Sequence, residues 1–341
     1  MKRLLNNSVA LFVVMIVLLL IIPLSPFLLD VMIIINISIS LIILLISMSI
    51  RSPLEFSIFP SLLLITTLFR LGINVSSTRN ILMHQGEAGA VIKAFGDFVL
   101  QGNAVVGFII FIIILLVQFI VINKGAERVA EVAARFTLDA MPGKQMAVDA
   151  DLSSGLITEA QARKRRSDIQ READFYGAMD GATKIVKGDA IMSLLITIVN
   201  LVGGSAIGML SFGMEFSEVL TVYSIATIGD GLVSQIPALL ISTATGMIVT
   251  RSVSEGSLNE DVSHQFLAQP RAIMIAGLVL LVLLFVPGMP KPQLLILGAG
   301  LLFAGFRLSQ RMTEMAEHAE KEEAKAQEAG AEQEASPDDY Y

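Results

Sequence analysis

Two acidic residues lie in parts of the sequence that are otherwise apolar. Asp189 comes just before the apolar run Ile191–Leu210, and Asp230 lies in a Gly-Asp-Gly motif inside another apolar run, Val219–Val249. A carboxylate in apolar surroundings is costly unless it is protonated or paired, so its environment sets its protonation state. Two such acids predict a proton relay in which each residue is neutral or ionised in turn.

Arg70 and Lys184 are the basic residues that we expect to pair with these acids. Arg70 follows the apolar run Ser57–Phe69, and Lys184 lies four residues after Asp180, the spacing of a salt bridge on one helical face. Asp189 also has a simpler interpretation. Because acids favour helix N-termini, it would cap a helix that begins directly after it. The relay role and the capping role both stay open.

A densely charged segment, residues 124–190, separates two apolar halves. From Lys124 to Asp189 it holds eleven Lys and Arg and eleven Asp and Glu, a balance that favours self-pairing and partner contacts over binding to a polyanion. Arg128, Arg135 and Asp139 are spaced by seven and four residues and therefore share a helical face. They form either a structural ion pair or a surface for a partner.

Local signals predict how this charged segment is divided. Thr158 and Gln161 have the spacing of a capping box, which predicts a helix from there to about Tyr176. Pro142-Gly143 and Ser153–Gly155 are turn signals. The segment is therefore expected to fold as three pieces.

The composition places the chain among polytopic membrane proteins. It is 54% hydrophobic and only 16% charged, and it contains no Cys, which excludes disulfides and thiolate chemistry. Eight apolar runs are expected to cross the membrane: Val9–Ile22, Phe27–Ile50, Ser57–Phe69, Val105–Ile122, Ile191–Leu210, Val219–Val249, Ala272–Val286 and Leu294–Phe306. A cleaved signal peptide is disfavoured because no cleavage site of small residues follows the first run.

Charge placement gives the expected topology. Lys2 and Arg3 and the bases of the charged segment favour the cytoplasm, so an even number of spans must lie between them. The short run Ser57–Phe69 then has to be a span, extended toward Asn74 and ending near Arg70. Asp30, at the start of the second run, is expected to be interfacial and merely tolerated.

The run Val219–Val249 is too long for one straight crossing. Its Gly-Asp-Gly motif and Pro237 predict a discontinuous helix. The predicted architecture is an all-α polytopic membrane protein of about eight transmembrane helices. Its parts are spans one to four in 1–123, a cytoplasmic loop in 124–190, spans five to eight in 191–310 and an acidic cytoplasmic linker in 311–341.

Several long motifs carry a family resemblance. The stretches RFTLDAMPGKQMAVDADLSSGLI, READFYGAMDGATK and KGDA, with FSIFPSLLLITTLFRLGINVSSTR and GDGLVSQIPALLISTATGMIVTRS, resemble the FHIPEP family of type III secretion export-gate proteins. The resemblance covers essentially the whole chain and favours the flagellar branch over the injectisome branch. It implies that this chain is the membrane half, without the large soluble C-terminal domain of the family.

The resemblance also implies roles for individual residues. Asp189 would couple the proton-motive force to protein export, with Asp180 and Lys184 in the same functional cluster. The matching positions linked to gate function are Arg70, Asp230, Arg128, Arg135 and Asp139. No catalytic residue, metal or cofactor is implied, and the chain is not expected to be an enzyme.

The partners implied by the family are a homo-oligomeric, nonameric ring, other export-gate membrane proteins and the lipid bilayer. The export ATPase complex and substrate–chaperone complexes would bind through the C-terminal domain, and no nucleic acid is expected. The expected location is the bacterial inner membrane, with both termini cytoplasmic.

Two other classes of protein were weighed. An ion or solute antiporter would use a similar Asp relay, but the sequence lacks an evident inverted repeat and the charged loop would have no role. An intramembrane aspartyl protease would need Gly-x-Gly-Asp and Tyr-Asp motifs, whereas Val186 and Thr227 stand where the first glycine would be.

Overall fold

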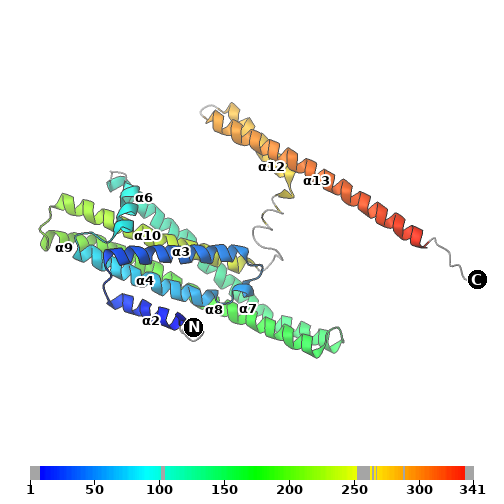
Figure 1. Ribbon diagram of the computed structural model, residues 1–341, viewed down its shortest axis with the longest axis horizontal. Coiled ribbons are helices and arrows are strands. Elements are labelled where there is room, and N and C mark those ends of the chain that lie inside the picture. The colour runs from blue at the N-terminus through cyan, green and yellow to red at the C-terminus, as the bar shows by residue number, and fades with distance from the viewer. Residues whose placement is uncertain are drawn as a thin grey trace, which may run out of the picture. The chain divides into compact units, whose positions relative to one another are not determined.

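A computed structural model describes residues 8–100, 104–251, 262, 265, 267–286 and 289–334. These residues are almost entirely helical, and no strand occurs among them (Figure 1). The chain divides into two compact units, Met1–Ser257 and Leu258–Tyr341. The all-α class expected from the sequence is confirmed.

The first unit contains nine α-helices and three shorter helical segments within its described residues. The α-helices are α2 (Ser8–Ile21), α3 (Pro26–Ser49), α4 (Phe59–Met83), α5 (Ala90–Leu100), α6 (Ala104–Val117), α7 (Lys124–Ser153), α8 (Glu159–Ile198), α9 (Gly204–Leu210) and α10 (Phe216–Thr250). The shorter segments are the 3-10 helix η1 (Pro53–Phe56) and the π-helices η2 (Gln118–Asn123) and η3 (Val199–Gly203). The π-helices join α6 to α7 and α8 to α9 without a break.

The second unit is a helical hairpin. Its elements are α12 (Pro270–Val282), the 3-10 helix η5 (Leu283–Phe285) and α13 (Lys291–Glu334). The helices α12 and α13 pack closely, and the backbone of each comes within about 3 Å of where a Cβ would lie on Gly298 or Gly277 of the other. Helix α13 continues into the acidic segment as far as Glu334.

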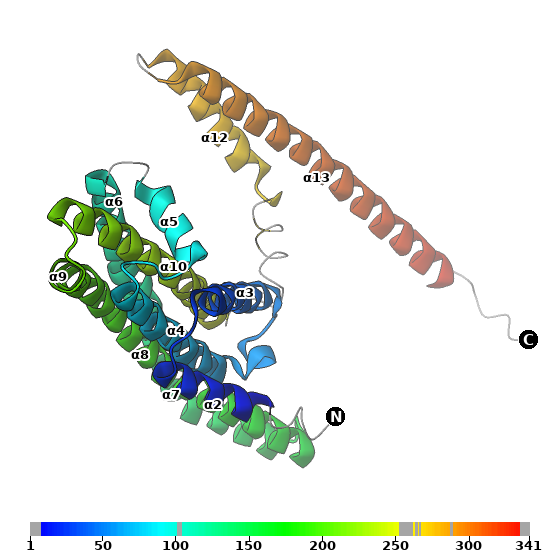
Figure 2. The ribbon, with the colours of Figure 1, turned by 60° about the vertical axis from the view of Figure 1, so that its left-hand side comes forward.

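The helices α4 and α10 form the centre of the first unit. Their most apolar windows are 61% and 56% buried, whereas the corresponding value for α3 is 28%. Helix α4 packs against α2, α3, α8 and α10, and α10 also contacts α5 and α6 (Figure 2). Polar side chains at the centre of these two helices, such as Arg70, Asn74 and Asp230, are therefore buried between helices.

Within the described residues, six helical segments are long and apolar enough to cross a membrane. They are Pro26–Ser49, Phe59–Met83, Val105–Ser153, Glu159–Leu210, Phe216–Thr250 and Lys291–Met312. The apolar helices Ala10–Ile21 and Pro270–Phe285 are shorter than the roughly 20 residues that one span needs. All eight apolar runs are helical, but the count of eight crossings stays a prediction.

The charged segment forms a helical hairpin of α7 and the first part of α8 (Figure 1). The predicted capping box is present, since Thr158 accepts from the Gln161 backbone at 3.3 Å and Gln161 accepts from the Thr158 backbone at 2.8 Å. The predicted turn at Ser153–Gly155 is also present, with Gly155 in the left-handed region at φ 76°. In both ribbon views the turn lies beyond the other helices of this unit.

Two predictions about this segment were wrong. Pro142 lies inside α7, so its Pro-Gly pair makes no turn. Helix α8 runs on past Tyr176 to Ile198. Long-range pairs between the helices, such as Lys144 with Glu172 at 2.7 Å, hold α7 and α8 together along their length.

The expected break in α10 was also wrong. One helix of 35 residues runs through Gly-Asp-Gly and Pro237. Gly229 serves close packing, because a Cβ there would lie 2.0 Å from the Ile92 carbonyl oxygen of α5. Near the proline, Gln118 donates to the Gln235 carbonyl at 3.3 Å and so ties η2 to α10.

Two residues of the first half also differ from expectation. Arg70 lies in the middle of α4 rather than at its end, because the helix continues to Met83. Asp30 has a specific structural role. Its carboxylate accepts the backbone N–H groups of Ala90 and Val91 at 2.9 and 3.0 Å and so caps α5.

Candidate functional site

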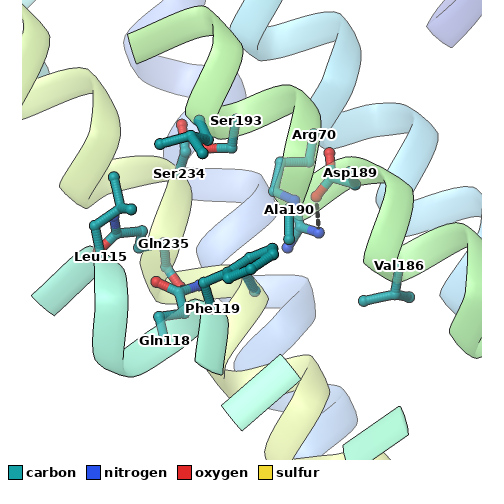
Figure 3. Close-up of a pocket in the computed structure, with 12 residues that line it drawn as sticks. Arg70, Leu115, Gln118, Phe119, Val186, Asp189, Ala190, Ser193, Ser234 and Gln235 are labelled. Carbon is teal, nitrogen blue, oxygen red and sulfur yellow. Dashed lines mark hydrogen bonds and ion pairs between the residues drawn. The ribbon is translucent and has the colours of Figure 1, made fainter. Parts of the chain in front are cut away.

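A buried ion pair between Arg70 and Asp189 lies at the centre of the candidate site (Figure 3). The Arg70 Nη2 group donates to Asp189 Oδ2, and the two side chains are only 5% and 3% exposed. Arg70 comes from α4 and Asp189 from α8, so the pair ties two helices that are distant in sequence. Breaking a buried pair by removing one partner typically costs about 3–5 kcal/mol.

The capping interpretation of Asp189 is wrong. Helix α8 begins at Glu159 and passes through Asp189 without interruption, so no helix N-terminus lies there. The sequence changes from charged to apolar at Asp189, which resembles the start of a new helix. The backbone, however, stays in the same helix through this position. The carboxylate is therefore held by Arg70 and not by free N–H groups.

Asp230 is a second buried acid, on α10. Its Oδ2 accepts from Asn200 Nδ2 at 3.0 Å, and Ser77 is a further side-chain hydrogen-bond partner. Across the described residues no basic side chain forms an ion pair with Asp230. The two acids thus have different surroundings: Asp189 faces a charged partner, whereas Asp230 faces polar but uncharged partners.

Lys184 and Asp180 are paired with each other, away from the buried acids. Their charged atoms are 2.7 Å apart and the lysine side chain is 65% exposed. The hydrogen bond to Asp180, with the charge of the same carboxylate, raises the pKa of the Lys184 ammonium. Because the lysine pKa is already well above neutrality, this amine stays protonated at physiological pH.

Polar residues from three helices lie on the same helical faces as the two acids. Each helix contributes them at three- to four-residue spacing, so they lie on one face. They are Arg70, Asn74 and Ser77 on α4; Asp189 and Ser193 on α8, with Asn200 in the adjoining η3; and Asp230 and Ser234 on α10. We refer to this set as the polar layer.

Ser234 Oγ donates to Asn74 Oδ1 at 2.7 Å within this layer. Along α8 the layer spans roughly 16 Å, from the rise of 1.5 Å per residue between Asp189 and Asn200. Both π-helices supply polar groups to α10, since Gln118 of η2 and Asn200 of η3 donate to it. Such π segments often occur at functional sites.

The charged residues of the layer were predicted from sequence, whereas Asn74, Ser77, Ser193, Asn200 and Ser234 were missed. The sequence does contain a pattern from which these residues could have been predicted. Small polar residues recur at helical spacing from Arg70, Asp189 and Asp230 inside apolar helices. Such a pattern marks a face that is turned away from lipid.

A small cavity adjoins the ion pair (Figure 3). It has a volume of about 30 Å³ and is lined by residues of α4, α6, η2, α8 and α10. Its polar lining consists of Arg70, Gln118, Asp189, Ser193, Ser234 and Gln235. Among the described residues no cluster of side chains is suited to hold a metal ion.

Two of the three predicted loop residues, Arg135 and Asp139, pair with each other as the ion-pair interpretation predicts, whereas Arg128 has a different partner. Arg128 pairs with Glu131 at 2.8 Å, and Arg135 lies 3.9 Å from Asp139. The side chains of Arg135 and Asp139 are 83% and 73% exposed, so this pair adds little stability. These charges remain accessible for contacts with another molecule.

The FHIPEP family profile matches residues 16–340. The chain is 54% identical over 329 residues to the flagellar biosynthesis protein FlhA of Bacillus subtilis (strain 168), a match that covers 94% of this chain and 48% of that protein. It is 49% identical over 294 residues to flagellar biosynthesis protein FlhA of Escherichia coli (strain K12), covering 85% and 42%.

A third relative, low calcium response locus protein D of Yersinia pestis, is 49% identical over 306 residues, covering 89% of this chain and 43% of that protein. The chain therefore spans less than half the length of the relatives it matches. No solved structure matches it.

Proposed function

Because this chain belongs to the FHIPEP family, we propose that it is the membrane part of a flagellar protein-export gate in which Asp189 couples proton movement to export. The buried Arg70–Asp189 pair supports this assignment most directly. Stability alone does not explain an ion pair between two membrane helices, because burying two charges is costly and apolar side chains of similar volume often stabilise a protein equally well. Intramembrane ionisable groups instead mark ion pathways.

The chemistry proposed for the pair is a change of charge. When Asp189 is ionised, it neutralises Arg70 and holds α4 against α8. When Asp189 binds a proton, the attraction is lost and a buried guanidinium is left without a counter-ion, which favours a different packing of the two helices. In this proposal, protonation of Asp189 causes a change in the packing of α4 and α8.

Helix α8 gives this change a route out of the membrane. The same 40-residue helix carries Asp189 and, toward its N-terminus, the exposed Asp180–Lys184 pair and the charged hairpin. A movement at Asp189 is therefore transmitted along a single rigid element. In this proposal the hairpin presents Arg128, Arg135 and Asp139 to neighbouring subunits or other gate proteins.

The chain is proposed to act as a transport component rather than an enzyme, in the bacterial inner membrane with both termini in the cytoplasm. It would form a homo-oligomeric, nonameric ring and contact other export-gate membrane proteins. The export ATPase complex and substrate–chaperone complexes would bind through the C-terminal domain typical of the family. An injectisome gate is the second candidate, because a relative without a flagellar name is 49% identical.

Loss of the gene is expected to abolish export of flagellar subunits while their synthesis continues. The measurement compares filament protein in the culture supernatant with that in cells, with the full-length gene restored as the control. Normal flagellar export in the deletion strain would exclude the flagellar assignment. Loss of a different set of secreted proteins instead would favour the injectisome branch.

Single cysteines test the topology and assembly, since this chain has none. A membrane-impermeant thiol reagent is expected to label Gly86→Cys from the periplasm and Ser154→Cys, at the hairpin turn, only after the cytoplasm is opened. Labelling of both from one side would contradict the proposed topology.

Arg135→Cys is expected to crosslink to other copies in intact membranes, and an exclusively monomeric product would argue against the ring.

A further inference from the structure

The cavity beside Arg70 and Asp189 has the size of a small water site. Its volume is about 30 Å³, and one buried water needs roughly 10–15 Å³ on this measure. About two water molecules therefore fit. The lining is polar enough to hold them, because hydroxyl and amide groups of α8, α10 and η2 surround the ion pair (Figure 3).

Three polar atoms at this cavity lack a hydrogen-bond partner among the described residues: Asp189 Oδ1, Arg70 Nε and Gln235 Oε1. All three side chains are buried, at a relative exposure of 9% or less. Leaving such an atom unpaired costs about 1–3 kcal/mol, and more when it is charged. One donor and two acceptors around a polar space match what bound water offers.

Ser234 provides a link from this cavity to the rest of the polar layer. It lines the cavity and donates its hydroxyl proton to Asn74 Oδ1 at 2.7 Å, so the oxygen lone pairs remain able to accept from water. Asp230 lies one helical turn away on the same face of α10. Because a hydroxyl hydrogen rotates freely, the Ser234 hydroxyl could donate toward Asp230 in place of Asn74.

We propose that this cavity binds water, and that the water and the Ser234 hydroxyl form the proton connection between Asp189 and Asp230. The proposal rests on the proton coupling proposed above. A proton leaving Asp189 Oδ1 joins the first water, which releases one of its own to the second. The second water protonates Ser234 Oγ as Ser234 gives its original proton to Asp230.

Each water and the serine end with the number of protons they started with. The net result is one proton moved from Asp189 to Asp230. The route avoids a proton transfer through Asn74, whose amide only accepts the hydroxyl hydrogen bond. Ser193 would form part of the wall of the water site, because this residue lies one turn after Asp189 and lines the cavity.

The test measures proton flux of the full-length protein in proteoliposomes with a pH-sensitive dye. Ser234→Ala is expected to lower the flux at least about tenfold, the effect of a barrier raised by about 1.4 kcal/mol, and Ser193→Val should do the same by filling the cavity. Ser234→Thr keeps the hydroxyl and should retain flux. The matched control is Thr243→Val on α10, where the lost hydroxyl bonds the Leu239 carbonyl at 2.8 Å outside the cavity.

A second measurement detects the water itself. Hydroxyl radicals made from bound water by X-rays should oxidise Phe119, which lines the cavity, and Ser193→Val should remove this labelling. Unchanged labelling in Ser193→Val would overturn the water site whatever the flux does.

The flux results separate the two proposals. If Asp189→Asn stops the flux while Ser234→Ala and Ser193→Val conduct as the natural protein does, the water route is wrong and proton coupling stands. If Asp189→Asn leaves the flux unchanged, proton coupling at Asp189 fails, and the labelling of Phe119 still decides whether water is bound.

Discussion

Replacing Asp189 by Asn in the full-length protein is expected to reduce flagellar export to the level of cells that lack the gene. Asn has the same shape and still offers an oxygen to Arg70, but it cannot gain or lose a proton. Glu ionises but is longer by one methylene group, so Asp189→Glu should retain part of the export. Export is measured as secreted filament protein per amount of gate protein in the membrane, which corrects for any loss of stability.

The matched control for this substitution is Asp168→Asn. Asp168 lies on the same helix in an exposed pair with Arg171, and its side chain is 42% exposed. Neutralising it should leave export close to the natural level, since exposed pairs contribute little. Export by Asp189→Asn that matches this control would show that the carboxylate is not needed, and the relay proposal would have to be abandoned.

The second large effect concerns the stability of the buried pair. Arg70→Met should destabilise the folded protein by about 3–5 kcal/mol, because it leaves the Asp189 carboxylate buried without its partner. Combining Arg70→Met with Asp189→Leu should restore most of this stability, since apolar residues of similar volume often replace a buried pair at no net cost. Export should remain absent in the double variant.

The comparison is made by thermal unfolding of the purified protein in detergent, with the single and double variants measured side by side. The expected pattern is strong coupling between the two substitutions, as found for residues in direct contact. Additive losses would mean that the pair does not act as a unit. Export by the double variant would mean that neither charge is required for transport.

These two experiments separate two roles of one contact. Stability depends on whether each buried charge has a partner, whereas the proposed coupling depends on whether one of them can change its charge. A double variant that is stable but does not export would show that the pair is not needed for folding. Proton coupling would then be the reason why two charges are retained between α4 and α8. The continuous helix α8 would then connect that event with the charged hairpin.

The sequence by itself determined the features that depend on near neighbours. The apolar runs predict the helices because each helix satisfies its own backbone hydrogen bonds. The capping box at Thr158 and Gln161 and the pair of Asp180 and Lys184 follow from spacings of three and four residues. Such contacts form within one turn, so residue identity and spacing are sufficient to predict them.

Helix ends and breaks were predicted less well, because a residue type that often ends a helix can also be required for packing against a helix that is distant in sequence. Gly229 and Pro237 indicate a broken helix when only the neighbouring sequence is considered. In the structure Gly229 gives room for the backbone of α5 near Ile92, and α10 stays continuous. Asp189 indicated a helix cap for a similar reason, since an acid before an apolar run is typical of a helix start.

Only the tertiary structure decided which polar groups meet. Arg70 and Asp189 are 119 positions apart, and Ser234 and Asn74 are 160 apart. The sequence named the two acids and the two bases, but it left the pairing among them open. The choice depends on which faces of α4, α8 and α10 pack together, and that is set by close fits over the whole bundle rather than by the charges. A buried charge then takes the partner that packing places beside it, because leaving the charge unpaired away from bulk water is costly.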